Sequence, residues 1–255
     1  MDSTDFCSLF PRERILKALP PVWPESLMAR IRETLSSRKS KVVVLDDDPT
    51  GTQTVYDIPV ITEWSVASLR RELQAAGPGF YILTNSRSLT PAETEQLHWE
   101  LGKNLLEAAQ SYSGRGKTPD LCVISRSDST LRGHFPLEIN ILAAALGSPD
   151  VVFLVPFFAE GNRLTIDNVH YLGQGQYLVP TGATPFAQDP VFGYKSWNLR
   201  EWIVEKSQGT IGGERIASIS LDDIRRGGPD RVFGIIRTLP RGTFCIVNAA
   251  DGRDL

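Results

Sequence analysis

KVVVLDDDPTGTQT, residues 41–54, is the stretch that decides the fold. Its apolar run is unbroken and rich in β-branched valine, which predicts a strand buried on both faces. Three consecutive carboxylates, Asp46, Asp47 and Asp48, come at the end of this strand. Neighbouring like charges repel unless a cation, a proton or a ligand hydroxyl lies between them. The stretch therefore predicts a core strand that ends in a loop with a chemical role.

The same pattern, an apolar strand followed by a polar loop, recurs along the chain. FYILT (80–84) precedes a helix expected at 90–112, with Thr90 as its cap and Glu93 as the capping-box partner. DLCVIS (120–125) precedes a helix expected at 136–147. This alternation of strand, polar loop and helix predicts right-handed βαβ units. The fold class is α/β, with a mainly parallel open sheet and helices on both faces. NVHYLGQGQYLVP (168–180) predicts a β-hairpin insertion, with Gly173 and Gly175 around its turn.

Further elements complete the expected order. We expect strands at 58–62, 151–156, 215–221 and 243–249, and helices at 65–77, within 189–209 and at 229–239. Residues 1–40 form an N-terminal extension with two short helices, and residues 41–255 form the main domain. The chain ends just after a predicted strand, so we expect a further domain to follow normally.

Composition limits the function classes. The 255 residues carry a net charge of −3, which gives no general attraction to nucleic acid or to an anionic membrane. No apolar stretch approaches the length of a membrane span, and the N-terminus lacks a signal-peptide pattern. Cys7, Cys122 and Cys245 are far apart and show no metal-ligand spacing. Reduced thiols and a cytoplasmic location are expected.

Polar loops follow the strands, and ligands bind outside the carboxyl ends of strands in an open parallel sheet. The arginines of these loops can bind a carboxylate or phosphate, the hydroxyls can donate, and the aspartates can accept from sugar hydroxyls. Together they suit a small polyhydroxy acid. The predicted binding residues of these loops are Asp48, Ser86, Arg87, Arg126, Asp128, Ser129, Thr130, Arg132 and Arg163, and one of Asp47, Asp48 and Asp128 could remove a proton from a hydroxyl. The resemblance described below completes the predicted set with Thr50, Gly133 and Asn162, and no metal site is predicted.

Taken alone, VVVLDDDPTGT also matches the D-x-D-x-T signature of haloacid-dehalogenase-like phosphatases. Asp46 would then be the nucleophile and Asp48 the acid, in a Mg²⁺-dependent reaction. FYILTN resembles the second motif of that superfamily, with Thr84 on the phosphate. The third motif is missing, because no lysine precedes the acidic pair of SISLDD (218–223) in a suitable position.

A second resemblance covers most of the chain from Lys41 onward. LDDDPTGTQTVYDIPVIT, LTNSRSLTPAE, SRSDSTLRGHFPLEI, VPFFAEGNRLTIDNVHYL and PFAQDPVFGY occur in that order. Together they resemble the N-terminal, substrate-binding domain of the four-carbon acid sugar kinase family, also known as domain of unknown function 1537. The resemblance matches Asp47 and Asp48 to the paired aspartates of the family, Ser86 and Arg87 to its serine–arginine pair, residues 128–133 to its DSTLRG loop, and Asn162 and Arg163 to the region after the next strand.

That resemblance implies a kinase that phosphorylates threonate, erythronate or 3-oxo-tetronates with ATP and Mg²⁺, both held mainly by a C-terminal nucleotide-binding domain. An aspartate, Asp47 by preference, would orient or deprotonate the attacking hydroxyl. The family tends to assemble, which allows a homo-oligomer. Two departures stand out: Ala183 precedes Thr184 where the family often has Glu, and the sequence stops before the nucleotide half. The chain alone is thus expected to bind a sugar acid without turning over ATP, and a non-catalytic binding remnant is a third interpretation.

Overall fold

A computed structural model describes residues 9–38, 40–53, 55–112 and 120–255, so Cys7 lies outside the described residues. The chain divides into two compact units. Unit 1 consists of residues 1–26, 129–132 and 149–255, and unit 2 of residues 27–128 and 133–148. The predicted DSTLRG loop is therefore shared, since Ser129–Arg132 group with unit 1 while Asp128 and Gly133 group with unit 2.

Unit 2 is built on a four-stranded sheet whose neighbouring strands all pair in parallel, as the sequence predicted. The strands are β2 (Lys41–Asp46), β3 (Val60–Ile61), β4 (Gly79–Leu83) and β5 (Leu121–Arg126), in the order β3-β4-β2-β5. The order reverses at β2, because β4 lies on one side of it and the later β5 on the other. A crevice at the carboxyl ends of the strands is expected at such a switch point.

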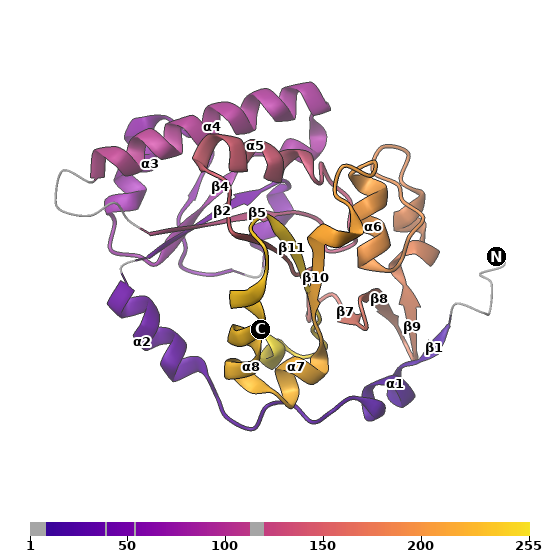
Figure 1. Cartoon of the computed structure of the whole chain (residues 1–255). Helices are drawn as coiled ribbons and strands as arrows, with labels where there is room; N and C mark the ends of the chain where they lie inside the picture. The colour runs from indigo at the N-terminus through magenta and orange to yellow at the C-terminus, as the bar shows by residue number, and fades with distance from the viewer. Residues whose placement is uncertain (1–8, 39, 54, 113–119) are drawn as a thin grey trace. The chain divides into compact units, whose positions relative to one another are not determined.

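Helices cover this sheet through a single apolar core. The helices of unit 2 are α2 (Met28–Arg38), α3 (Val66–Gln74), α4 (Pro91–Tyr112) and α5 (Leu137–Leu146). Val43 and Phe80 of the sheet pack with Leu69 of α3 and Leu105 of α4, and all four are at most 1% exposed. Figure 1 shows α3, α4 and α5 together along the sheet. The predicted capping box of α4 is confirmed, because Thr90 and Glu93 bond reciprocally.

Unit 1 contains two smaller sheets (Figure 1). A parallel sheet has the order β10-β11-β6, and an antiparallel sheet has the order β1-β9-β8-β7. The bounds are β1 (Phe10–Pro11), β6 (Val151–Leu154), β7 (Arg163–Ile166), β8 (Val169–Gln174), β9 (Tyr177–Pro180), β10 (Ile216–Ile219) and β11 (Thr243–Val247). The β8–β9 hairpin is confirmed; Gly175 takes the positive φ of its turn, whereas Gly173 lies inside β8.

The helices of unit 1 are α1 (Arg12–Ala18), α6 (Leu199–Lys206), α7 (Leu221–Arg225) and α8 (Gly228–Thr238). The sequence prediction had no counterpart to α7, a single turn that a Ser220–Asp223 capping box starts. It also placed Arg163 in a loop, whereas pairing with β8 makes Arg163–Ile166 a strand. The α/β class and the parallel strands are confirmed, although the hydrogen bonds divide the parallel strands between two sheets. Among the described residues, no helix is both long and apolar enough to cross a membrane.

Candidate functional site

The three consecutive carboxylates of residues 46–48 resolve their repulsion by bonding to different groups. Asp46 Oδ1 accepts a hydrogen bond from Arg126 Nη1 at 3.3 Å. Asp47 accepts from Arg87, and Asp48 Oδ1 accepts from the backbone N–H of Thr50 at 2.8 Å. The run after β2 is therefore an array in which arginines from the ends of β4 and β5 neutralise much of the charge.

Asp47 and Arg87 form the closest ion pair of this array. Arg87 Nη2 donates to Asp47 Oδ1 at 2.5 Å, and Nε donates to Oδ2 at 3.0 Å, so the contact is bidentate. Ser127 Oγ also donates to Asp47 Oδ2, at 3.1 Å. Arg87 Nη1 extends the pair to Asp48 Oδ2 at 3.3 Å. These bonds use three of the five N–H donors of the guanidinium.

Burial controls the ionisation of Asp47, which is 1% exposed. Desolvation, with a smaller contribution from the negative charge of Glu138, raises the pKa of Asp47 to about 6. The hydrogen bonds and charge of Arg87 and the bond from Ser127 oppose this rise without overcoming it. By contrast, bonds from Thr50 lower the pKa of the half-buried Asp48. Asp47 is therefore the more easily protonated of the two carboxylates.

Asp46 faces the protein interior. It is 0% exposed, burial raises its pKa, and its Oδ2 has no hydrogen-bond partner among the described residues. Its carboxylate packs against Gly51, where an added Cβ would overlap both oxygens. A nucleophile must reach a substrate phosphorus atom, so this burial disfavours the phosphatase interpretation, in which Asp46 attacks.

Backbone bonds fix the ends of β4, β2 and β5 against one another. The N–H groups of Thr84 and Arg87 donate to the carbonyls of Asp46 and Asp47, at 2.9 and 3.1 Å. The Asp47 N–H donates to the Arg126 carbonyl at 3.2 Å. The predicted gathering of Asp47, Asp48, Thr50, Ser86, Arg87 and Arg126 is thus present within unit 2. Asp128 joins them electrostatically, because its charge acts on Arg87.

A buried polar group missed by the sequence prediction adjoins this array. Glu138 of α5 accepts from Ser86 Oγ at 2.6 Å and from Ser125 Oγ at 3.0 Å. His98 of α4 has its Nε2 3.8 Å from Glu138 Oε1. The available signal was a lone charged residue in the helix LEINILAAAL, whose other residues are apolar apart from Asn140. Ser127 was also missed, although it lies within the quoted loop SRSDSTLRG.

The Ser129–Arg132 segment is held by a separate set of contacts in unit 1. His170 Nε2 lies 2.8 Å from the Ser129 carbonyl, and Tyr194 donates its hydroxyl to the Thr130 carbonyl at 2.7 Å. Arg132 lies over the ring of Phe186 with 5.1 Å to its centroid. Arg132 also donates to Asp189 Oδ2 at 3.5 Å and to Thr130 Oγ1 at 3.3 Å. Asp189, Phe186 and Tyr194 were not predicted.

The remaining predicted residues form hydrogen bonds or close contacts of their own. Asn162 accepts from Arg12 Nη1 at 3.1 Å, and Arg163 Nη1 donates to the Gly161 carbonyl at 2.7 Å. Gly133 has φ 135°, as expected for a turn glycine, and a Cβ there would approach Asp47 Oδ2 at 3.3 Å. Thr184, at the departure from the family pattern, is buried and donates to the Thr181 carbonyl at 2.6 Å. His134 Nε2 lies 3.0 Å from the Leu89 carbonyl.

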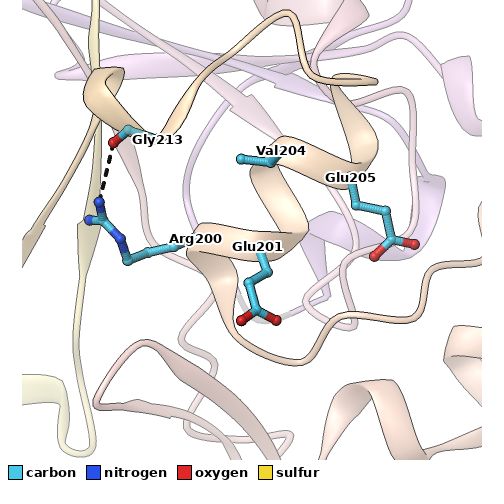
Figure 2. Close-up of a pocket in the computed structure, with 5 residues that line it drawn as sticks. All are labelled: Arg200, Glu201, Val204, Glu205 and Gly213. Atoms are coloured by element: carbon cyan, nitrogen blue, oxygen red, sulfur yellow. Dashed lines mark hydrogen bonds between the residues drawn. The ribbon is translucent and has the colours of Figure 1, made fainter.

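A surface depression lies elsewhere in unit 1, on α6 (Figure 2). It is lined by Arg200, Glu201, Val204, Glu205 and Gly213. Arg200 donates to the Gly213 carbonyl at 3.2 Å, and Glu205 accepts from two backbone N–H groups. Its lining contains none of the predicted site residues. Within the described ranges no three His, Cys, Asp or Glu side chains gather as metal ligands.

Comparison with known proteins also points to a sugar-binding domain. A family model described as a sugar-binding N-terminal domain matches residues 42–255. A D-erythronate kinase of Heliobacterium modesticaldum is 25% identical over 190 residues, which cover 71% of this chain and 39% of the kinase. The chain therefore spans well under half the length of that relative.

Solved structures share the fold at low identity. A domain of unknown function 1537 from Bordetella bronchiseptica, crystallised with bound citrate as a domain-swapped dimer, is 20% identical with a TM-score of 0.58. A Haemophilus influenzae protein of the same family label is 18% identical with a TM-score of 0.55. They match 84% and 83% of this chain, which covers 49% of each of them.

The close packing of Gly51 on Asp46 yields a stability prediction. Gly51→Ala is expected to destabilise the protein by about 1–3 kcal/mol, because the new methyl group overlaps a buried carboxylate and its loop must shift. Urea unfolding measures the change. In the same unit, Gly77→Ala places its Cβ in open space and is the matched control, expected within about 0.5 kcal/mol of the wild type. Equal effects of the two substitutions would contradict the packing described for Asp46.

The raised pKa of Asp47 yields a pH prediction. Because its folded pKa of about 6 exceeds the ordinary value of 3.8, stability from this group is full below pH 4 and is lost as the pH rises through 6. Relative to Asp47→Asn, wild-type protein should lose up to about 3 kcal/mol of unfolding free energy between pH 4 and 7. Urea unfolding of both proteins at matched pH checks this. If the unfolding free energy of the wild type relative to Asp47→Asn does not change with pH, or rises with pH, then Arg87 outweighs burial in setting the pKa of Asp47.

Proposed function

We propose that this chain, which belongs to the family of sugar-binding N-terminal domains, binds a four-carbon sugar acid. It would act as the substrate-binding half of an ATP-dependent kinase. The observation that carries the proposal is the array of Asp47, Asp48 and Arg87 at the switch point of the unit 2 sheet. Such an array offers guanidinium groups for a carboxylate and carboxylates for hydroxyls. Threonate, erythronate and 3-oxo-tetronates are the substrate class.

The recognition chemistry divides among residue types. Arg87 and Arg126 remain partly exposed while bonded to aspartates, so each can add a bond to an acid carboxylate. Arg132 of unit 1, steadied by the Phe186 ring and by Asp189, stays a predicted carboxylate contact. Asp48, whose side chain is 26% exposed, is the carboxylate of the run that solvent reaches most readily, and it suits a sugar hydroxyl.

For Asp47, the predicted base, two features compete. Its pKa of about 6 suits a general base near neutral pH. Its two oxygens, however, already accept from Arg87 and Ser127 and are nearly inaccessible to solvent. We therefore assign Asp47 the orientation of Arg87 and assign Asp48 the first contact with the hydroxyl. The base role of Asp47 remains a prediction that requires displacement of Ser127.

The relatives support the substrate class without deciding it. One is named D-erythronate kinase, and citrate, bound in the Bordetella structure, is a hydroxy acid with several carboxylates. The domain-swapped dimer of that structure supports a homo-oligomer for this chain. ATP and Mg²⁺ belong to the proposal as cosubstrates held mainly by a domain outside these 255 residues. Among the described side chains, no three His, Cys, Asp or Glu gather as metal ligands.

Binding is the direct test. Isothermal titration calorimetry with D-erythronate and L-threonate should show one site, with an affinity that falls about tenfold or more in Arg87→Ala and in Arg126→Ala, because each loses charge-assisted bonds. Asp48→Asn should weaken binding of the acids more than binding of citrate, which has a single hydroxyl. The 255-residue protein should not consume ATP, because phosphoryl transfer also requires a nucleotide site and Mg²⁺.

The matched control is Arg226→Ala, which removes an exposed arginine paired with Asp222 on the surface of α7. It should leave the affinity unchanged. Absence of binding to any four-carbon acid would overturn the proposal, and robust kinase activity of the 255 residues would overturn its division of labour. Binding that never supports phosphorylation when a nucleotide-binding half is added would instead favour a non-catalytic binding module.

A further inference from the structure

Glu138 is out of place in its helix. It lies in the first turn of α5, whose other residues are apolar apart from Asn140, and it is only 4% exposed. A buried carboxylate is costly unless hydrogen bonds and opposite charge compensate it. The contacts of Glu138 therefore indicate why this position carries a charge.

Those contacts come from three other elements. Ser86 Oγ, from the turn after β4, donates to Glu138 Oε1 at 2.6 Å. Ser125 Oγ, from β5, donates to Oε2 at 3.0 Å. His98 of α4 directs Nε2 at Oε1 across 3.8 Å. Both oxygens are thus held, and α5 is tied to the ends of the two strands that flank β2.

His98 is the third neighbour of the Glu138 carboxylate. Its Nδ1 lies 2.9 Å from the Thr94 carbonyl. Its Nε2 faces Glu138 Oε1 across 3.8 Å, which is longer than a hydrogen bond. Both side chains are nearly inaccessible to solvent, so the ring helps to enclose the carboxylate.

The group leads directly to the Asp47–Arg87 pair. Ser86 precedes Arg87 in a short 3-10 turn, which begins after Asn85 in a left-handed conformation. The hydroxyl bond to Glu138 fixes one residue of this turn, and the next residue carries the guanidinium that grips Asp47. Ser86 also receives a bond from Thr84, whose hydroxyl reaches the Asp46 carbonyl.

We propose that Glu138, held by Ser86 and Ser125, is a positioning residue of the sugar-acid site that fixes the Ser86–Arg87 turn and so sets the Asp47–Arg87 pair. This inference rests on the proposed function for its purpose, since the pair is the element assigned to bind the acid. Glu138 acts through Ser86 and through its charge, without touching the ligand.

The charge of Glu138 affects the pKa of Asp47, which can be measured independently of any change in the shape of the site. Asp47 is faced by Arg87 from the turn after β4, by Ser127 from the loop after β5, by Glu138 from α5 and by its neighbour Asp48. In this set the negative charge of Glu138 raises the pKa of Asp47. Asp128 acts on the same site through Arg87. Removing the Glu138 charge must therefore make Asp47 easier to ionise.

The test is a carboxyl ¹³C NMR titration of the ligand-free protein, with the Asp47 signal assigned by its loss in Asp47→Asn. Glu138→Gln keeps the side-chain shape and removes the charge. It should move the Asp47 midpoint downward, because the charge is lost while the amide oxygen can still accept from Ser86. Glu138→Leu also removes that bond, and it should weaken D-erythronate binding about tenfold. Glu63→Gln is the matched control, because Glu63 in the same unit also accepts from a serine hydroxyl, that of Ser68. It should change neither quantity.

An Asp47 midpoint that is the same in Glu138→Gln and wild type overturns the proposal. If Glu138→Gln does not fold, Ser86→Ala serves instead. It removes the hydroxyl that ties the turn to Glu138, so Arg87 should hold Asp47 less firmly and the Asp47 midpoint should rise; an unchanged midpoint there also overturns the proposal. The titration needs no ligand, so it is independent of the proposed function. A shifted midpoint in a protein that binds no four-carbon acid would reject that function while retaining the coupling of Glu138 to Asp47.

Discussion

The bidentate pair between Arg87 and Asp47 is the constraint on which the rest of the candidate site depends. It joins the turn after β4 to the loop after β2, and Ser127 adds the loop after β5 through the same carboxylate. Taking both charges out of water is expensive, and such a pair seldom stabilises a fold better than apolar side chains would. Its value lies in geometry, because a guanidinium held at two points presents its remaining donors in one direction.

The depth of Asp47 follows from the strand that precedes it. Val43 and Leu45 of β2 are buried in the core, so the chain leaves the sheet from its interior and the first carboxylates are buried too. Only Asp48, one residue further along, regains contact with solvent. The gradient in burial along three consecutive aspartates separates their roles: Asp46 packs against Gly51, Asp47 orients an arginine, and Asp48 is left to meet a ligand.

Much of this arrangement could be predicted from the sequence because its signals are local. The valine run predicts β2, the Thr90–Glu93 box predicts the start of α4, and the rule for parallel strands brings the polar loops of unit 2 together. What could not be predicted depends on contacts distant in the chain. The burial of Asp47 and the contacts of Glu138 need the packed helices, and β7 exists because β8 pairs with it.

A site for an anionic acid that contains three aspartates poses an electrostatic problem, and burial of the first two carboxylates reduces it. Three carboxylates against the guanidinium groups of Arg87 and Arg126 would leave one excess negative charge in the run. Burial raises the pKa of Asp46, whose unpartnered Oδ2 could hold a proton, and raises that of Asp47 to about 6. Each proton taken up removes one negative charge while the arginines stay charged. Burial of the aspartates therefore has two effects. The buried carboxylates hold the guanidinium groups in one orientation, and their raised pKa leaves more of the arginine charge available to a carboxylate ligand.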